Sequence, residues 1–313
     1  VYFGLDGGAS STRAVLIDEN GKTLNKKKLN EGTNLKVYEG LANQRISNLI
    51  LSLCDDISMS IDDINAFGFG LAAVSYERGR ELFFKELDRL NIAEKSVLIN
   101  DAEAAYKISC QEDVGILVTV GTGIICIAKN SSGEFVRIAG KGHDNSDIGS
   151  GYWIGKEVLL KLAFNESIIN EESDLLQLNN ILCEKFNKNN FQDALNYISE
   201  DQNSLRLKAS IAEDVLSISH ENEIALSILQ EATYNVSEYI IDLNQMLDYN
   251  DSNELILFAN GSIINSSIYR KSLNDALSFN YSNINWISSK ISAAYGSAMI
   301  ASLSKDKVVI KVQ

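Results

Sequence analysis

The sequence predicts an α/β protein made of two related lobes. The main observation is a repeat: residues 1–18, VYFGLDGGASSTRAVLID, and residues 114–128, VGILVTVGTGIICIA, each read as apolar strand, glycine-rich turn and second apolar strand. Strand and helix patterns alternate after each copy. No linker divides the 313 residues, a length that suits two domains. Because two such turns could bind one polyphosphate from opposite sides, we expect a cleft between the lobes.

The first lobe is expected to comprise residues 1–112. After its hairpin, the patterns indicate strands at 22–30, 64–70 and 96–100 that alternate with helices at 40–58, 78–90 and 102–109. The first of these helices is amphipathic, and its apolar face should be buried: Leu41, Ile46, Leu49, Ile50, Leu53 and Ile57. This order predicts a sheet with helices packed on it.

The second lobe is expected to comprise residues 113–290. After its hairpin, the patterns indicate a strand at 135–139, a polar loop at 140–151, helices over 152–247, and strands at 254–259 and 283–287. The clearest helix, 223–247, places these apolar residues on one face: Leu226, Leu229, Ala232, Val236, Tyr239, Ile240, Leu243 and Leu247. We interpret the helical stretch as core and scaffold. An alanine-rich helix is predicted at 291–304.

Composition restricts the possible functions. The net charge of −14 argues against nucleic acid as a partner, and the basic run Lys26-Lys27-Lys28 reads as the solvated end of a strand. The four cysteines form no CxxC pair, which fits reduced thiols, and two histidines cannot supply a zinc cluster of the usual spacings. No signal-peptide pattern or membrane-length apolar run is present. We therefore expect a cytoplasmic protein without a membrane partner.

The first hairpin turn carries groups suited to an anion and a cation. Gly7 and Gly8 have no Cβ, so their N–H groups are open to a phosphate, and Ser11 and Thr12 add hydroxyl donors. Asp6 could hold a divalent cation through water. Taken alone, this segment could equally be an ordinary hairpin with a polar turn.

The second glycine-rich turn is Gly121-Thr122-Gly123. Because the chain carries two such turns, phosphate binding is favoured at both turns over an ordinary hairpin. The pair resembles the phosphate-1 and phosphate-2 loops of the actin, sugar kinase and Hsp70 superfamily. Within it, the sequence is most similar to the N-acetylglucosamine kinase and BadF/BadG/BcrA/BcrD ATPase branch. The resemblance implies two ribonuclease H-like lobes with an ATP cleft between them and a helical insertion in the second. It also implies that the helix at 291–313 joins the first lobe, that ATP and Mg²⁺ are cofactors, and that the protein is a homodimer.

A third nucleotide segment is Phe258-Ala259-Asn260-Gly261-Ser262. It resembles the adenosine motif of the superfamily, which implies that Gly261, Ser262 and the following Asn265 bind the nucleotide. Any one of these short motifs is weak evidence, whereas the whole set in this order is strong. The P-loop pattern GxxxxGK[ST] and the dinucleotide pattern GxGxxG are absent.

Asp101 is the catalytic candidate. It stands where a predicted strand becomes a helix, in Ile99-Asn100-Asp101-Ala102, a position at which Asp often serves only as a helix N-cap. In sugar kinases of the superfamily, the Asp at the matching position accepts the proton of the sugar hydroxyl. The resemblance therefore implies that Asp101 contacts the sugar and is the general base.

Two segments resemble the sugar-binding parts of N-acetylglucosamine kinases. Thr33-Asn34 resembles a Thr-Asn pair whose amide bonds sugar hydroxyls, and the loop from residue 140 to 153 resembles a Gly-Trp-Gly-His … Gly-Asp-Glu-Gly-Ser run. Lys141 and Ile148 depart from that pattern, standing where Trp and Glu are usual. The implied substrate-binding residues are Asn34, Gly140, Lys141, Gly142, His143 and Asp147, although His143 could instead be a structural hydrogen bonder.

These motifs predict an ATP-dependent amino-sugar kinase that phosphorylates N-acetylglucosamine, at the 6-hydroxyl. Lys141 suggests that N-acetylmuramic acid, which carries a carboxylate, is also a substrate, unless this lysine simply points to solvent. One alternative is an ATPase that activates a reductase or dehydratase, as in the BadF branch, but it needs suitably placed cysteines for an iron–sulfur cluster. Another alternative is a nucleotide-binding sugar sensor without catalysis.

Overall fold

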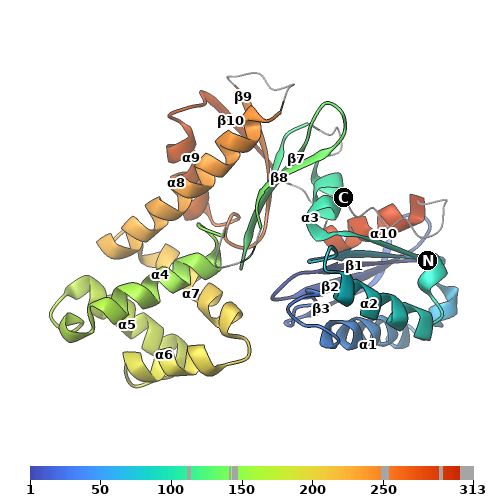
Figure 1. The fold of residues 1–313 in the computed structure, drawn as a ribbon, viewed down its shortest axis with the longest axis horizontal. Helices are drawn as coiled ribbons and strands as arrows, with labels where there is room; N and C mark the ends of the chain where they lie inside the picture. The colour runs from blue at the N-terminus through green and yellow to red at the C-terminus, as the bar shows by residue number, and fades with distance from the viewer. Residues whose placement is uncertain (111–113, 141, 143–146, 248–253, 289–291, 304–313) are drawn as a thin grey trace. The chain divides into compact units, whose positions relative to one another are not determined.

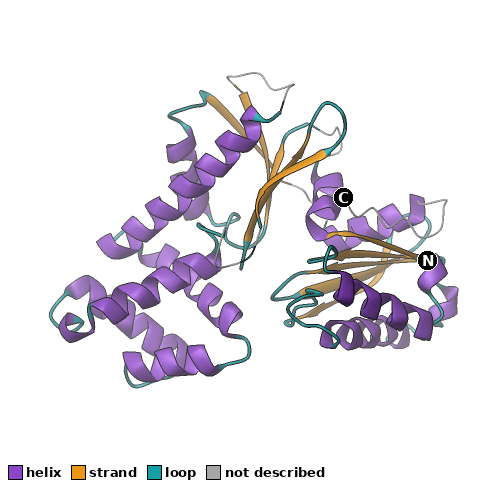
Figure 2. Cartoon of the chain, viewed as in Figure 1, coloured by secondary structure: helices purple, strands orange, loops and turns teal. Residues whose placement is uncertain are grey.

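The computed structural model describes residues 1–110, 114–140, 142, 147–247, 254–288 and 292–303. The chain forms two compact units, Val1–Gln111 with Ser289–Gln313, and Glu112–Ser288. Each unit contains one five-stranded sheet together with helices (Figure 1, Figure 2). The predicted α/β class is confirmed.

The first unit's sheet has the order β3-β2-β1-β4-β5. Its strands are β1 (Tyr2–Gly7), β2 (Thr12–Ile17), β3 (Thr23–Leu29), β4 (Ala66–Leu71) and β5 (Ser96–Asn100). The first three strands pair antiparallel, while β1, β4 and β5 run parallel. Parallel strands end at one edge of a sheet, so the segments that follow β1, β4 and β5 emerge along the same edge.

The second unit's sheet repeats this connectivity. Its strands are β6 (Ile116–Val120), β7 (Ile124–Lys129), β8 (Phe135–Ala139), β9 (Glu254–Asn260) and β10 (Asn283–Ser288), in the order β10-β9-β6-β7-β8. Again the first three strands pair antiparallel and the last two run parallel to the first. The repeat seen in the sequence is therefore a repeat of topology, and each glycine-rich turn joins the first two strands of a sheet.

Helices cover both faces of the first sheet. The helices α1 (Leu41–Asp55) and α2 (Glu77–Arg89) pack on one face over a core rich in phenylalanine, in which Phe69 meets Phe83 edge to face at 5.1 Å between ring centroids. On the other face lie α3 (Asp101–Ser109) and α10 (Ala293–Leu303) (Figure 1). Each helix packs against the sheet with its apolar side.

Glycine allows α10 to lie directly against the sheet. A Cβ on Gly4 of β1 would stand 2.0 Å from the carbonyl oxygen of Ala294, and one on Gly68 of β4 would stand 1.9 Å from that of Ser297. Neither position accepts a side chain while the helix stays in place. The C-terminal helix is thus packed onto the strand that carries Asp6 and Gly7.

The second unit adds six helices to its sheet within the described residues: α4 (Gly151–Phe164), α5 (Ser173–Phe186), α6 (Phe191–Glu200), α7 (Ser204–Ile218), α8 (Glu223–Gln245) and α9 (Ser267–Leu277). The long helix α8 packs against β6, β7 and β8. The helices α4 and α7 cross closely, because a Cβ on Gly155 would stand 1.9 Å from the carbonyl oxygen of Lys208. Single 3₁₀ turns occur at Ile61–Asp63, Ala93–Lys95 and Glu166–Ile168.

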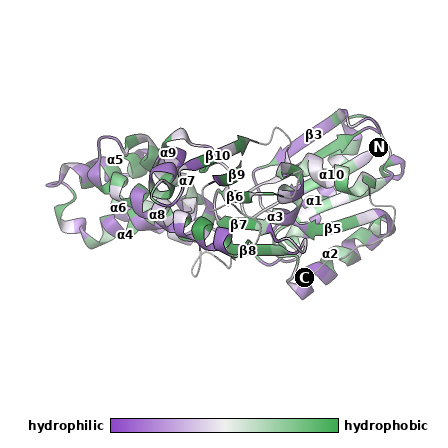
Figure 3. Cartoon of the chain, turned by 90° about the horizontal axis from the view of Figure 1, so that it is seen from above, coloured by the Kyte–Doolittle hydropathy of each residue, from purple (hydrophilic) through white to green (hydrophobic). Residues whose placement is uncertain are grey.

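Some details differ from the sequence prediction. Leu41, Ile57 and Leu226 were expected in the core but are exposed, since the first two lie at or beyond the ends of α1 and the third faces solvent on α8. Helix α9 was not predicted. The lysine-rich strand β3 is an edge strand and largely hydrophilic, as expected (Figure 3). Where the structure describes helices, none combines the length and apolar character needed to span a bilayer.

Candidate active site

The turn between β1 and β2 is fixed by backbone hydrogen bonds from two other segments. The N–H groups of Thr33 and Asn34 donate to the carbonyl oxygen of Gly8 at 2.9 and 3.1 Å, and the Ala72 N–H donates to that of Gly7 at 2.9 Å. The turn is therefore tied to the segment after β3 and to the end of β4. The Gly8 N–H donates within the turn, to the carbonyl oxygen of Ser11 at 3.2 Å.

The two glycines of this turn have different roles. A Cβ on Gly7 would stand 2.0 Å from Oγ1 of Thr33, whereas a Cβ on Gly8 would meet nothing within 4 Å. Gly7 is thus required by packing inside the protein. The open space at Gly8 suits the close approach of a ligand to the backbone.

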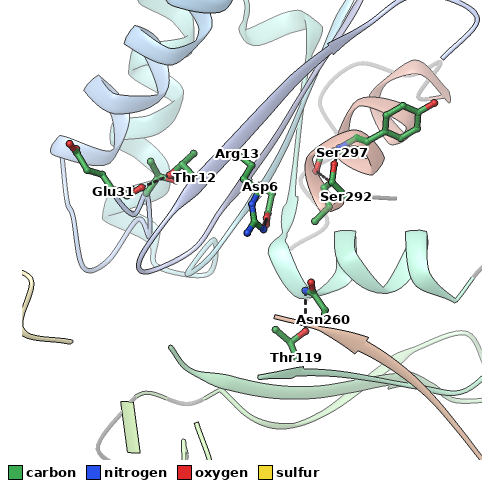
Figure 4. Close-up of polar contacts among 11 residues, drawn as sticks. Asp6, Thr12, Arg13, Glu31, Thr119, Asn260, Ser292 and Ser297 are labelled. Atoms are coloured by element: carbon green, nitrogen blue, oxygen red, sulfur yellow. Dashed lines mark hydrogen bonds and ion pairs between the residues drawn. The ribbon is translucent and has the colours of Figure 1, made fainter. Parts of the chain in front are cut away.

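Thr12 faces the interior. It is fully buried, and its hydroxyl lies 2.8 Å from the carbonyl oxygen of Glu31 and 3.0 Å from Oγ1 of Thr33 (Figure 4). These contacts hold the segment that contains Thr33 and Asn34 against the turn. Ser11, one residue earlier, is half-buried.

Asp6 and Arg13 are register partners on β1 and β2, and their side chains point toward one another (Figure 4). The closest guanidinium nitrogen and carboxylate oxygen are 3.8 Å apart, and the Asp6 side chain is 24% exposed. Burial raises the pKa of Asp6 to about 6, against a smaller lowering effect of Arg13. Among the described residues, the Asp6 carboxylate accepts no hydrogen bond and no cluster of three or more metal-ligating residues occurs.

The second glycine-rich turn supports the start of α4. The N–H of Gly151 donates to the carbonyl oxygen of Gly121 at 2.8 Å, and that of Tyr152 donates to Thr122 at 3.1 Å. The Gly121 N–H is used within the turn, donating to Gly123 at 2.9 Å. A Cβ on Gly121 would meet nothing within 4 Å, so this position, like Gly8, is open.

The predicted adenosine motif lies beside that turn. The N–H groups of Ile263 and Ile264 donate to the carbonyl oxygen of Val120, the residue before Gly121, at 3.0 and 3.2 Å. Gly261 has a φ of 104°, and a Cβ there would stand 2.4 Å from the same carbonyl. Only glycine fits this conformation and this contact. Ser262 is exposed at the tip.

Asn265 is held by two neighbours. Its Nδ2 donates to the carbonyl oxygen of Gly261 at 2.8 Å, and its Oδ1 accepts from a guanidinium nitrogen of Arg270 at 3.1 Å. Asn260 donates to Oγ1 of Thr119 at 3.3 Å (Figure 4). An open pocket of about 300 Å³ adjoins Asn265 and is lined further by Ser267, Arg270, Lys271 and Asn274. Sequence reasoning missed this pocket, because its lining residues other than Asn265 belong to the unpredicted helix α9.

Asp101 is the first residue of α3, directly after β5. The N-cap is Asn100, whose Oδ1 accepts from the Ala102 N–H at 3.0 Å. Asp101 Oδ1 also lies 3.0 Å from that N–H. In the sheet register Gly7 pairs with Leu71, and Leu71 pairs with Asn100. Gly7, Leu71 and Asn100 therefore form one row across the sheet, at the ends of β1, β4 and β5. Asp101 follows this row by one residue.

The predicted sugar-binding residues are placed in two regions. Asn34 Oδ1 accepts from the N–H groups of Lys36 and Val37 at 2.9 and 3.0 Å. Its Nδ2 has no partner among the described residues and can donate elsewhere. Gly140 and Gly142 are exposed and have φ values of 69° and 113°. Lys141 and His143 lie outside the described residues.

Asp147 belongs to a segment pinned against helices. Asp147 is 4% exposed and its carbonyl oxygen accepts from the Ser150 N–H at 3.1 Å. Two residues later, the carbonyl oxygen of Gly149 accepts from the buried Tyr269 hydroxyl at 2.8 Å. A Cβ on Gly149 would stand 2.6 Å from the carbonyl oxygen of Ala232. The backbone around Asp147 is thus fixed by α8 and α9.

Two units that repeat one five-stranded topology, each with a glycine-rich turn after its first strand, define an α/β protein of the actin, sugar kinase and Hsp70 fold. The model of the BadF/BadG/BcrA/BcrD ATPase family matches residues 3–301. This chain therefore belongs to the BadF/BadG/BcrA/BcrD ATPase family.

Three similar proteins are informative. The N-acetylmuramic acid/N-acetylglucosamine kinase of Clostridium acetobutylicum is 26% identical over 95% of this chain and 97% of its own. The N-acetyl-D-glucosamine kinase of Dictyostelium discoideum is 23% identical over 97% and 98%. A crystal structure from Chromobacterium violaceum, named as a candidate N-acetylglucosamine kinase, superposes with a TM-score of 0.74 at 19% identity and covers 96% of this chain and 98% of its own.

Proposed function

We propose that this chain is an ATP- and Mg²⁺-dependent kinase that transfers the γ-phosphate of ATP to a hydroxyl of an amino sugar. Its membership of an ATPase family and its similarity to two amino-sugar kinases support this proposal. The observation that carries it is the position of Asp101, one residue beyond the row of strand ends that includes Gly7. Neighbouring strands lie about 5 Å apart, so a carboxylate and a phosphate turn two strands away can serve one reaction.

In the proposed reaction Asp101 is the general base. Its carboxylate accepts the hydroxyl proton as the sugar oxygen forms a bond to the γ-phosphorus. The bond from that phosphorus to the β–γ bridging oxygen breaks, and ADP leaves. Because Asn100 already caps α3, the Asp101 carboxylate is not the group on which the helix start depends.

The nucleotide would be bound by the open backbone positions of both turns. Gly8 and Gly121 leave space for the phosphates to approach the backbone, and Gly7, Ser11, Thr122 and Gly123 would complete the two phosphate loops. For Thr12 we propose a positioning role, because its hydroxyl already forms hydrogen bonds with Glu31 and Thr33. Gly261, Ser262 and Asn265 would contact the adenosine part.

Mg²⁺ would be held by Asp6 through water. This carboxylate is largely buried, has only one distant ion-pair partner and accepts no hydrogen bond from a described residue, so it is poorly satisfied without a cation. When bound, the ion would neutralise charge on the transferring phosphates. The arrangement fits a hydrated magnesium ion, which commonly uses one or two protein carboxylates.

For the acceptor we propose N-acetylglucosamine and N-acetylmuramic acid, phosphorylated at the 6-hydroxyl. Asn34, Asp101 and Asp147 would contact the sugar hydroxyls and Gly140 and Gly142 the sugar through their backbone, as the resemblance implies. Lys141 and His143 are included on sequence grounds alone. A lysine that faces the sugar pocket would attract the carboxylate of the muramic sugar.

The test is ADP release with a panel of sugars, and phosphorus NMR of the product to identify the phosphorylated oxygen. Asp101→Asn should keep the fold and ADP affinity while kcat falls about 10²- to 10⁴-fold, the usual effect of losing a general base. The matched control is Asp88→Asn, which removes an exposed carboxylate on α2. A decrease of less than about tenfold for Asp101→Asn would exclude its role as base.

The alternative function, activation of a reductase through an iron–sulfur cluster, is not favoured. None of the four cysteines forms a disulfide in the part of the chain that the structure describes: Cys54, Cys110 and Cys126 are buried, and Cys183 is half-buried on α5. Burial raises the pKa of Cys126 to about 12, which disfavours the thiolate that ligates iron. ADP release that depends on sugar would also exclude a non-catalytic sensor.

A further inference from the structure

We propose that Arg45 is a positioning residue that holds the first glycine-rich turn and the segment containing Asn34 together as one unit, through Gly32 and Tyr38. This inference rests on the proposed function and adds to it a residue that acts on both ligands through others. One side chain on α1 thereby influences how tightly the nucleotide and the sugar bind.

The segment between β3 and α1 connects two parts of the candidate site. It carries Asn34, and it packs directly on the glycine-rich turn. The hydroxyl of Thr12 donates to the carbonyl oxygen of Glu31 at 2.8 Å (Figure 4), and the N–H groups of Thr33 and Asn34 donate to that of Gly8. A shift of this segment therefore also shifts the turn.

The tip of the turn is held by Tyr38. The Tyr38 hydroxyl donates to the carbonyl oxygen of Ala9 at 2.8 Å. Gly32 belongs to the same contact, because a Cβ on it would stand 2.1 Å from that carbonyl oxygen and 2.6 Å from a carbon of the Tyr38 ring. Ala9 is thus in contact with both the backbone of the segment and its aromatic side chain.

Arg45 joins these contacts from α1. Its guanidinium lies over the Tyr38 ring, 4.7 Å from the ring centroid, and its Nη1 donates to the carbonyl oxygen of Gly32 at 2.7 Å. Its Nε lies 2.6 Å from Oε2 of Glu31, in an ion pair that lacks the alignment of a hydrogen bond. The Arg45 side chain is only 16% exposed, whereas that of Glu31 is 58% exposed. The hydrogen bond and the cation–π contact are therefore expected to contribute more than the ion pair.

A positioning role and a purely structural role predict different results. Loss of the Arg45 side chain should lower stability in either case, because the guanidinium is largely buried. If Arg45 positions the site, the affinities for ADP and for the sugar should fall together, since the turn and Asn34 are linked. The kcat at saturating ligands should change less than either affinity, because none of these contacts involves Asp101.

Isothermal titration of ADP and steady-state kinetics with N-acetylglucosamine test the inference. Loss of one neutral hydrogen bond predicts that Tyr38→Phe weakens ADP binding about 2- to 10-fold. Arg45→Met loses a hydrogen bond from a charged donor, so both the Kd for ADP and the KM for the sugar should rise roughly tenfold. Arg45→Lys should lie between Arg45→Met and the wild type, because it keeps the charge but not the planar fork.

Tyr76→Phe is the matched control. The Tyr76 hydroxyl donates to Oε2 of Glu39 at 2.7 Å, so it holds the residue next to Tyr38 without contacting the turn. Its removal should leave the Kd for ADP and the KM for the sugar at their wild-type values. Thermal unfolding of all variants shows whether each one is folded at the temperature of the measurement.

The possible outcomes separate this inference from the proposed function. Wild-type values of both constants in folded Arg45→Met would overturn the inference and leave the proposed function standing. If Arg45→Met does not fold, unchanged ADP affinity in Tyr38→Phe would overturn it instead. Equal weakening in Tyr76→Phe and Tyr38→Phe would also overturn it, since general loosening of the segment would then suffice. Failure of the wild-type chain to bind ADP would overturn the proposed function together with this inference.

Discussion

At Asp6, two physical effects act on a single carboxyl group, and the larger one makes it a pH-sensitive element of the free protein. Burial raises its pKa from 3.8 to about 6, and Arg13 offsets only part of this change. Between these two values the folded state keeps a proton that the unfolded state has already lost. The free energy of unfolding should therefore decrease as pH rises from about 4 to about 6, and then level off.

The prediction for this residue is that Asp6→Asn abolishes that decrease. At about 1.4 kcal/mol per unit of pKa, the difference between variant and wild type should grow to no more than about 3 kcal/mol in favour of the variant. Urea denaturation of both proteins at several pH values, without metal or nucleotide, measures it. Parallel pH profiles for the two proteins would mean that Asp6 has an ordinary pKa.

Single residues also show what a sequence can reveal about a site. The residue types at Asp6, Gly8 and Gly121 suffice to suggest a phosphate and metal site, because their chemistry is local. The role of Gly7 could not be predicted, since the group it must avoid is the side chain of Thr33, which is distant in sequence. The orientation of Thr12 toward Glu31 depends on the same tertiary contact.

At the scale of elements, the segment around Asp147 is held in place by helices rather than by its own sequence. The buried hydroxyl of Tyr269 on α9 donates to the carbonyl oxygen of Gly149 at 2.8 Å. Tyr269→Phe leaves that carbonyl without a partner, which typically costs about 1–3 kcal/mol. We expect this loss of stability together with a raised KM for the sugar and an unchanged KM for ATP.

Urea denaturation and steady-state kinetics of Tyr269→Phe test this prediction. Tyr281→Phe is a matched control, because the Tyr281 hydroxyl is also largely buried and accepts from Asn244 Nδ2 at 3.1 Å. Both variants should lose stability, but only Tyr269→Phe should change the KM for the sugar. A sugar KM that changes equally in both would assign the effect to general loosening.

Element prediction from sequence worked where the pattern was long and apolar. The strands of both sheets and the helix α8 were predicted within a few residues of their bounds. Helix α9 was missed although Tyr269, Leu273 and Leu277 recur every fourth residue and are buried. The signal was present, but the segment is short and mostly polar between these positions, so its apolar stripe is recognisable only against the surface it covers.

At the scale of the whole molecule, the repeat predicts that both glycine-rich turns respond to one nucleotide. Two topologically equivalent sheets each carry one glycine-rich turn, and the proposed function assigns both turns to one nucleotide. Binding of ADP with Mg²⁺ at about 100 times its Kd should stabilise the folded chain by about 2.7 kcal/mol. Amide hydrogen exchange should then slow in the turn at residues 7–12 and also in the turn at residues 121–123.

The variant Gly121→Val tests whether the protection of both turns by ADP depends on the second turn. Its Cβ has free space in the protein, so the fold should persist, while the added side chain occupies the space needed by the phosphates. In this variant ADP should fail to protect either turn, and sugar affinity should remain near that of the wild type. Persistent protection of residues 7–12 at wild-type ADP affinity would remove the second turn from the phosphate site. Protection of only one turn in the wild type would show that a nucleotide does not use both copies of the repeat.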